Sequence, residues 1–274
     1  MKNNILAFAV VIALVTGCAG LAADSGKVQP SAAKQIMFAY LTDETGANDW
    51  VNWLTAKGFV ADKFNASEAN TTSFLNTDLI IIGYDTENAW GVYTLTPNTT
   101  AIMHTGLPVL GIGYGGYYYL WAAGAGTDGK GTGDSGLSEV YATNSSHTIW
   151  NKPNKITIPI DGNVTVHKSP VGGKSIDISY LPANVTVLAN KSSDLGRCLI
   201  TNETSQYFIW GFDTQSPSDL TSDGKKLMHN LIWFAIPSGY PVPEFDGSIY
   251  ATAGFAGIMG AVAAVVFIAH RKRD

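Results

Sequence analysis

The chain has 274 residues, of which 46% are hydrophobic and only 14% are charged, and its formal net charge is -5. Such a composition can bury one domain-sized core once the two ends of the chain are set aside. Basic residues form no run before the extreme C-terminus, which excludes the electrostatic footprint of a nucleic-acid-binding protein. We therefore expect no nucleic-acid partner.

The first 23 residues have the three parts of a secretory signal peptide. Lys2 supplies the charged head, residues 5–15 are apolar, and small residues follow from Thr16 to Gly20. The apolar run is too short to cross a bilayer comfortably as a helix. Residues 15–18 also resemble a lipobox, whose Cys18 would become a lipidated first residue. Residues 24–34 then form a linker to the domain predicted at 35–236.

The first half of that domain alternates strands and helices. Apolar strands are predicted at Gln35–Leu41, Phe59–Phe64 and Asp78–Gly83, and helices at Asp49–Lys57 and Thr94–Thr105. Strand, helix, strand in this order implies right-handed crossovers. We expect an α/β domain with a doubly wound, mostly parallel sheet.

Residues 107–120, LPVLGIGYGGYYYL, predict a sharp elbow between a buried strand and a helix. Such an elbow presents a group at the carboxyl end of the sheet. Its apex, where an enzyme would carry a nucleophile, is Gly113. The aromatic side chains of Tyr114 and Tyr117 follow, and rings at this edge can stack on a sugar or pack in the core.

Beyond the elbow helix the predicted strands are short and separated by turns, which indicates an antiparallel second half. Gly124–Gly136 reads as a flexible surface loop; it fits a phosphate-loop pattern except that Gly131 stands where Ser or Thr should bind magnesium. A last helix is predicted at Thr221–Ile236, with Ser218 or Asp219 as a cap. The predicted strands are 155–160, 163–167, 175–180, 185–189, 197–201 and 206–212.

No metal or cofactor site is expected from the spacing of the five histidines. Asp213, Asp219 and Asp223 gather after a late strand, where they would cap a helix or bind a sugar hydroxyl or calcium. With Cys18 in the leader, Cys198 stands alone and no intrachain disulfide is possible.

Eight Asn-x-Ser/Thr sequons occur, which favours a glycosylated domain outside the cell. Asn and Thr are also common in turns and strands, so some sequons arise by chance. The candidate acceptors are Asn65, Asn70, Asn98, Asn144, Asn163, Asn184, Asn190 and Asn202.

The C-terminal region predicts an anchor. Residues 249–270 are long and apolar enough to span a membrane, and the basic tail 271–274 would remain cytoplasmic. The preceding linker, 237–248, contains Pro243, Glu244 and Phe245. This order resembles the PEF-CTERM sorting signals of archaeal surface proteins, and it implies an archaeosortase as processing partner. A plain single-pass anchor is the alternative. Either arrangement places the domain at the cell surface.

The strand DLIIIG, the elbow and the segment FIWGFDTQSPSDL resemble the class I glutamine amidotransferase-like fold over most of residues 35–236. That family carries a Gly-Ile-Cys-x-Gly elbow and a late strand that ends in Phe-His-Pro-Glu. Here Gly113 replaces the cysteine, Asp213 the histidine and Gln215 the glutamate. The resemblance therefore implies the fold without its catalytic residues. Residues 146–149, which include His147, resemble a segment of ThuA-like, sugar-associated branches.

These observations predict a noncatalytic surface protein that serves as a binding or structural module of the archaeal envelope. Surface glycans or envelope proteins would be its partners. The candidate ligand-binding residues are Gly113, Tyr114, Tyr117, His147 and Asp213. The alternative is a surface hydrolase of a sugar or amide substrate, in which Asp213, Glu139 and His147 converge near the elbow.

Overall fold

The computed structural model describes residues 33–91, 95–125, 130–203 and 206–236. The predicted signal peptide, the Pro-Glu-Phe motif, the transmembrane segment and the basic tail lie outside these ranges, as does most of the first linker. Across the described ranges, no helix combines the length and apolar character needed to cross a bilayer.

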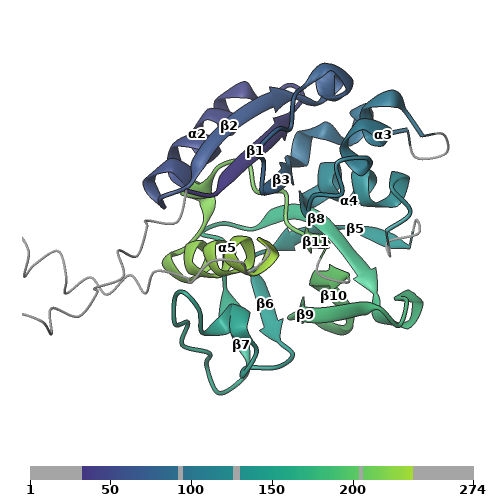
Figure 1. Ribbon diagram of the computed structural model, residues 1–274. Coiled ribbons are helices and arrows are strands. Elements are labelled where there is room, and N and C mark those ends of the chain that lie inside the picture. The colour runs from purple at the N-terminus through teal and green to yellow at the C-terminus, as the bar shows by residue number, and fades with distance from the viewer. Residues whose placement is uncertain (1–32, 92–94, 126–129, 204–205, 237–274) are drawn as a thin grey trace, which may run out of the picture. The chain divides into compact units, whose positions relative to one another are not determined.

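One sheet of 11 strands runs through the domain in the order β2-β1-β3-β4-β11-β10-β9-β6-β7, and β8 joins β10 and β5 beside this path. Figure 1 shows the sheet with helices on either side of its first strands. The strands are β1 (Gln35–Tyr40), β2 (Val60–Asn65), β3 (Leu79–Ile82), β4 (Val109–Ile112), β5 (Gly131–Leu137), β6 (Glu139–Ala142), β7 (Asn163–Thr165), β8 (Val171–Asp177), β9 (Val185–Lys191), β10 (Asp194–Glu203) and β11 (Tyr207–Trp210).

The five strands from β2 to β11 are parallel and confirm the doubly wound prediction for this half of the sheet. β3 and β4 are buried along their whole length, as expected for strands covered on both faces. Two apolar clusters provide that cover, one under α2 (Glu44–Ala56) and α5 (Ser222–Ala235), the other under α3 (Pro97–Met103) and α4 (Gly113–Ala122).

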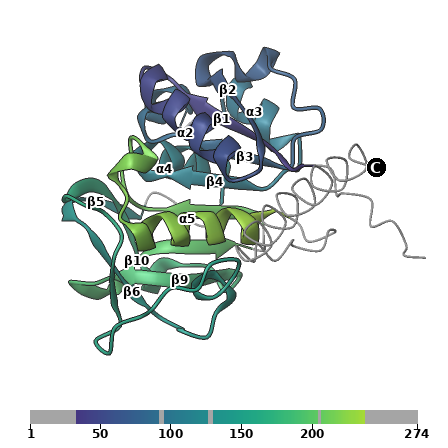
Figure 2. The ribbon, with the colours of Figure 1, turned by 90° about the vertical axis from the view of Figure 1, so that its left-hand side faces the viewer.

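The remaining strands pair antiparallel. Four strand pairings in the sheet are parallel and six are antiparallel. The expectation of a mostly parallel sheet is therefore wrong, although the antiparallel second half is confirmed. Figure 2 shows β1 to β4 toward one end of the sheet and β6, β9 and β10 toward the other. Consecutive strands β9, β10 and β11 pair as hairpins, which need no crossover helix.

Two predicted segments differ in kind from what the structure shows. Residues 131–136, predicted as loop, belong to β5, where they pair with β8. Residues 155–160, predicted as a strand, join no strand. Their backbone is held locally, because Ile156 N donates to Trp150 O and Asn154 N donates to the buried Asn230 of α5.

Helix starts also differ from prediction. α2 begins at Glu44, five residues early, because the Asp43 side chain accepts a hydrogen bond from Gly46 N at 2.9 Å. α5 is capped by Thr221, whose hydroxyl accepts from Gly224 N. Asp219 instead forms a capping box with Ser216 over the short 3-10 helix η6 (Pro217–Asp219).

Candidate functional site

The elbow predicted after β4 is present. Ile112 ends the strand in an extended conformation, and Gly113 begins α4 with φ of +54°, the left-handed region that glycine adopts without strain. α4 has no side-chain cap from Ile112. Its first backbone N–H groups are therefore open to an acceptor from elsewhere in the chain.

Glycines let β4, α4 and the end of β3 approach closely. A Cβ built on Gly116 would collide with the backbone of Gly111, and one on Gly115 would collide with the carbonyl oxygen of Gly83. The Gly-x-Gly-x-Gly-Gly pattern of the elbow thus reflects backbone-to-backbone packing. This packing fixes the direction in which the elbow faces.

Asp213, which follows β11, places its carboxylate over the apex. Its Oδ1 accepts a hydrogen bond from Tyr114 N at 2.8 Å and so caps α4. A Cβ on Gly113 would collide with the same Oδ1. The space that an apex side chain would need is therefore filled by a carboxylate from the neighbouring strand. The structure brings Gly113, Tyr114 and Asp213, three of the candidate ligand-binding residues, into contact.

The environment of Asp213 disfavours its charged form. Burial raises the pKa of this carboxyl to about 6, and the negative charge of Glu87 adds to the increase. The Tyr114 N–H and the Lys174 ammonium act in the opposite direction. Asp213 therefore changes charge close to neutral pH.

A pocket of about 530 Å³ with a mixed polar and apolar lining opens beside Asp213 at the carboxyl end of the parallel strands. This is where ligands bind in open α/β sheets. Residues from three separate segments line it: Tyr84, which follows β3, the residues after β11, and the loop 168–170 together with the start of β8. The lining residues are Tyr84, Lys168, Ser169, Pro170, Val171, Gly172, Asp213, Gln215, Ser218 and Asp219.

The tyrosines of α4 surround a lysine of the protein itself. Lys174 Nζ lies 4.6 Å from the ring centroid of Tyr114, 5.1 Å from that of Tyr117 and 5.5 Å from that of Tyr118. These are cation–π distances. Burial lowers the pKa of Lys174. Tyr117 is buried and accepts a hydrogen bond from Gly131 N at 2.6 Å, so its ring and hydroxyl are engaged within the fold.

His147 lies away from the elbow. Its Nδ1 accepts from Ile149 N at 3.3 Å, and its ring packs edge-on against Phe234 at 5.1 Å. Phe234 is near the end of α5, whereas the pocket precedes the first turn of that helix, and the rise from Thr221 to Phe234 is roughly 20 Å. Glu139 accepts a hydrogen bond from Thr165 on β7. The predicted convergence of Asp213, Glu139 and His147 does not occur.

The sequons differ in exposure. Asn70, Asn144 and Asn184 are exposed. In contrast, Asn190 and Asn202 are each only 9% exposed, and the amide of Asn190 donates to Leu195 O at 2.8 Å. Both lie in paired strands of the sheet. A glycan on either of these side chains would require the sheet to open locally.

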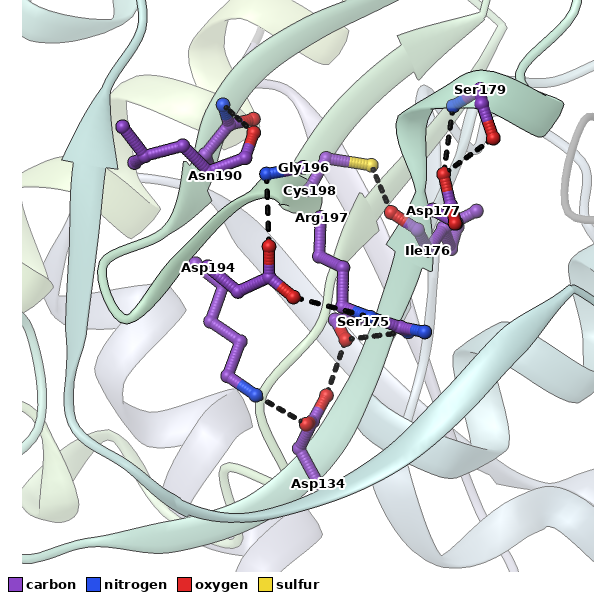
Figure 3. Close-up of polar contacts among 12 residues, drawn as sticks. Asp134, Ser175, Ile176, Asp177, Ser179, Asn190, Asp194, Gly196, Arg197 and Cys198 are labelled. Atoms are coloured by element: carbon purple, nitrogen blue, oxygen red, sulfur yellow. Dashed lines mark hydrogen bonds and ion pairs between the residues drawn. The ribbon is translucent and has the colours of Figure 1, made fainter.

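The antiparallel half contains a second polar cluster (Figure 3). The carboxylate of Asp134 pairs with Lys191 at 2.6 Å and accepts the hydroxyl hydrogen bond of Ser175, which Arg197 also approaches at 3.4 Å. Nearby Cys198 is buried and donates to Ile176 O. Burial raises the pKa of this thiol to about 12, so it is an inert core residue. The described ranges contain no His, Cys, Asp and Glu group suited to a metal ion.

Tyr84, the loop 168–170 and the first two residues of β8 were not predicted as site residues. Tyr84 stands directly after the apolar strand DLIIIG, so the rule that ligands bind beyond strand carboxyl ends would have located it. The segment 168–172 has no such signal, because its place in the pocket depends on the bridge between Gly173 and Phe212 and on the hydrogen bond from Asp213 N to Gly172 O.

No protein-family model and no curated protein matches the chain. Solved structures do match. A candidate GMP synthase subunit from Thermoplasma acidophilum superposes with a TM-score of 0.51 at 13% identity, over 74% of this chain and 94% of its own. PurLQS from Thermotoga maritima gives 0.49 at 14% identity over 74% and 99%. A glutamine amidotransferase from Thermotoga maritima gives 0.40 at 12% identity over 73% and 81%.

The first of these similarities, at 13% identity, shows the fold alone. The chain has a mixed α/β sheet fold that matches glutamine amidotransferase-like neighbours, and the elbow and strand segments predicted such a fold. The activity of those proteins is not transferred by the fold.

Proposed function

We propose that this chain is a noncatalytic cell-surface protein whose amidotransferase-like domain serves as a binding module of the archaeal envelope. The observation that supports this most directly is the position of Asp213. Its carboxylate fills the space of an apex side chain at Gly113 and accepts the hydrogen bond of Tyr114 N–H. In hydrolases with such an elbow, the backbone N–H of the residue after the nucleophile stabilises the oxyanion. The corresponding N–H here, that of Tyr114, already donates to Asp213.

The positions that correspond to the family's cysteine, histidine and glutamate carry Gly113, Asp213 and Gln215. Glutamine hydrolysis needs a thiolate and a base that generates it. Cys198 does not replace the missing thiol, because it is buried within β10. The pocket beside Asp213, with its mixed hydroxyl, carboxyl and amide lining, is the proposed ligand site.

The full-length chain, purified in detergent, tests this function in two assays. We expect no release of ammonia from glutamine, and we expect binding in a screen of glycans and small metabolites. Binding should disappear in Asp213→Ala and persist in Asp62→Asn, which removes one exposed negative charge from β2. Turnover of glutamine, or binding unchanged by Asp213→Ala, would contradict the proposal.

We further propose export through residues 1–23 and anchoring through the Pro243-Glu244-Phe245 signal and the segment 249–270. Archaeosortase is the processing partner in this scheme. Mass spectrometry of the mature protein from an archaeal host tests it: the expected product lacks the segment 249–270. A mature chain that keeps its basic tail would instead support the plain single-pass anchor.

A surface hydrolase acting on a sugar or amide is the second candidate. The pKa of Asp213, raised to about 6, favours it, because a general base works best near the ambient pH. The distinguishing measurement is turnover of chromogenic glycoside and amide substrates. Activity that is lost in Asp213→Asn would support the hydrolase, and its absence across the panel would support the binding module.

A further inference from the structure

The pocket beside the elbow is unsuited to an anionic ligand. The N-terminus of a helix attracts negative charge, and α4 directs its first N–H groups toward this edge of the sheet. That position is taken, since Asp213 Oδ1 accepts from Tyr114 N at 2.8 Å. A ligand carboxylate or phosphate would have to displace this side chain and then lie beside its charge.

The second oxygen of Asp213 remains available. No hydrogen bond or ion pair from the described residues reaches Oδ2. It lies directly beside Gly172, whose carbonyl oxygen accepts a hydrogen bond from Asp213 N at 2.9 Å. Glycine leaves room for Oδ2 here, because a Cβ on Gly172 would lie 2.7 Å from it. Asp213 is half-buried, so a ligand that donates to Oδ2 would add a charge-assisted hydrogen bond in a site partly shielded from water.

The charges around the pocket are mainly negative. Asp219 lines it together with Asp213, and Glu87 acts on Asp213 from the neighbouring 3-10 helix η3 (Tyr84–Ala89). Two lysines lie nearby. The ammonium of Lys174 is held among the tyrosine rings of α4, and Lys168 lines the pocket and is exposed to solvent. Neither forms an ion pair with Asp213 among the described residues. The ring of Tyr84 adds a face suited to a cation.

We propose that this pocket binds its ligand through a primary ammonium group, which donates to Oδ2 of Asp213. The inference rests on the proposed binding function and specifies its ligand class. An ammonium satisfies both the missing hydrogen bond and the missing positive charge, whereas a neutral hydroxyl satisfies only the first. Charge-assisted hydrogen bonds are roughly twice as strong as neutral ones. An amino sugar or a lysine side chain of a peptide could supply the group.

Calorimetric titration of the full-length chain in detergent at pH 7 tests the proposal with matched pairs of probes. D-glucosamine is compared with D-glucose, and Nα-acetyl-lysine amide with Nα-acetyl-norleucine amide. We expect at least one amine to bind tenfold or more tightly than its neutral counterpart, and the tighter amine identifies the source. Asp213→Asn should abolish this preference, and Asp62→Asn, with the same change in net charge, should keep it.

The outcomes separate this inference from the proposed function. If neutral and amine probes bind equally, or if the preference survives Asp213→Asn, the ammonium assignment is wrong while a binding module remains. If no probe or compound of the wider screen binds, both proposals fail.

A second measurement uses pH. The amines stay protonated between pH 7 and pH 5, while Asp213, with its pKa raised to about 6, becomes mostly neutral. The preference for amines should therefore fall by roughly tenfold at pH 5. The other charged groups around the pocket are Glu87, Asp219, Lys168 and Lys174, together with Asp43 and Asp85, which act on Tyr84. A preference independent of pH in this range would place the ammonium on a group other than Asp213.

Discussion

The two halves of the sheet are stabilised in different ways. In the parallel half, wholly apolar strands pack under helices, and glycines allow backbone to touch backbone at the elbow. In the antiparallel half, polar side chains such as Asp134, Lys191 and Ser175 hold neighbouring strands together. The parallel half therefore depends on the absence of side chains at a few positions, and the antiparallel half depends on specific pairs of side chains.

The candidate site lies where these halves meet. β11 pairs in parallel with β4 and antiparallel with β10, and Asp213 lies three residues after its end. The elbow therefore belongs to the parallel half, while Gly172 and its loop come from the antiparallel half. Substitutions made separately in each half, and at their junction, show which contacts stabilise each part.

The largest effect is expected from Gly115→Ala in the parallel half. Its Cβ would collide with the carbonyl oxygen of Gly83, and backbone cannot move aside as a flexible side chain can. We expect a loss of about 3 kcal/mol in the free energy of unfolding, measured by urea denaturation. Gly196→Ala is the control, since its Cβ would meet only the exposed Asp194 side chain, at 3.2 Å. Equal effects of both changes would refute the close-packing account.

Asp134→Ala tests the antiparallel half. Its side chain is 9% exposed, and its removal leaves Lys191 and Ser175 without their acceptor. We expect a loss of about 2 to 3 kcal/mol. The control is Glu44→Ala, which breaks the surface pair with Lys63; because Glu44 is 63% exposed, the loss should be about 0.5 kcal/mol or less. A loss from Asp134→Ala no larger than this control would mean that polar pairs do not hold this half.

A double-mutant cycle of Gly113→Ala and Asp213→Ala tests the contact between the elbow and the carboxylate after β11. Gly113→Ala alone strains a positive-φ position and collides with the Asp213 carboxylate, whereas removal of that carboxylate relieves the collision. We expect the two changes to be non-additive by about 2 kcal/mol, with the double variant more stable than the sum predicts. Additive effects would show that the carboxylate does not occupy the apex space.

The smallest effect concerns pH. The pKa of Asp213 rises on folding from its ordinary value of 3.8 to about 6. The folded state thus holds this proton more tightly, and the stability contribution present below pH 3.8 is lost as pH rises through about 6. The amide in Asp213→Asn does not ionise, so the variant keeps this contribution as the pH rises. We expect its free energy of unfolding to exceed that of the natural chain by about 1 to 2 kcal/mol at pH 8. Thermal unfolding from pH 4 to pH 8 should show the two chains diverging; parallel curves would contradict the raised pKa.

Much of the parallel half could be predicted from sequence. Runs such as Leu79–Ile82 are apolar over their whole length, and only a strand covered on both faces is stable with that composition. The elbow could be predicted as well, because glycines clustered after an apolar run indicate that two backbone segments approach closely. Gly131–Leu137 was not readable, since Gly, Thr and Asp favour a loop and only pairing with β8 makes this segment a strand.

Local rules also misplaced single residues. Asp219 is of a residue type that commonly caps helices and stands just before α5, yet its side chain closes the capping box of η6. Thr221 is the residue that caps α5. His147 was grouped with the elbow by resemblance to a short segment, but Phe234 holds it near the far end of α5. A motif of three or four residues does not specify which end of a helix its loop will pack against.

The sequence by itself determined the apex glycine, the aspartate at the end of β11 and the α/β order of the first half, because these follow from residue type and hydrophobic period. Tertiary structure decided what those residues do. Only the pairing of β4 with β11 brings the Asp213 carboxylate onto Tyr114 N, across 99 positions of chain. Only the fold of β8 puts Lys174 among the tyrosines, because cation–π contacts and pocket walls depend on strand register, which residue type alone does not specify.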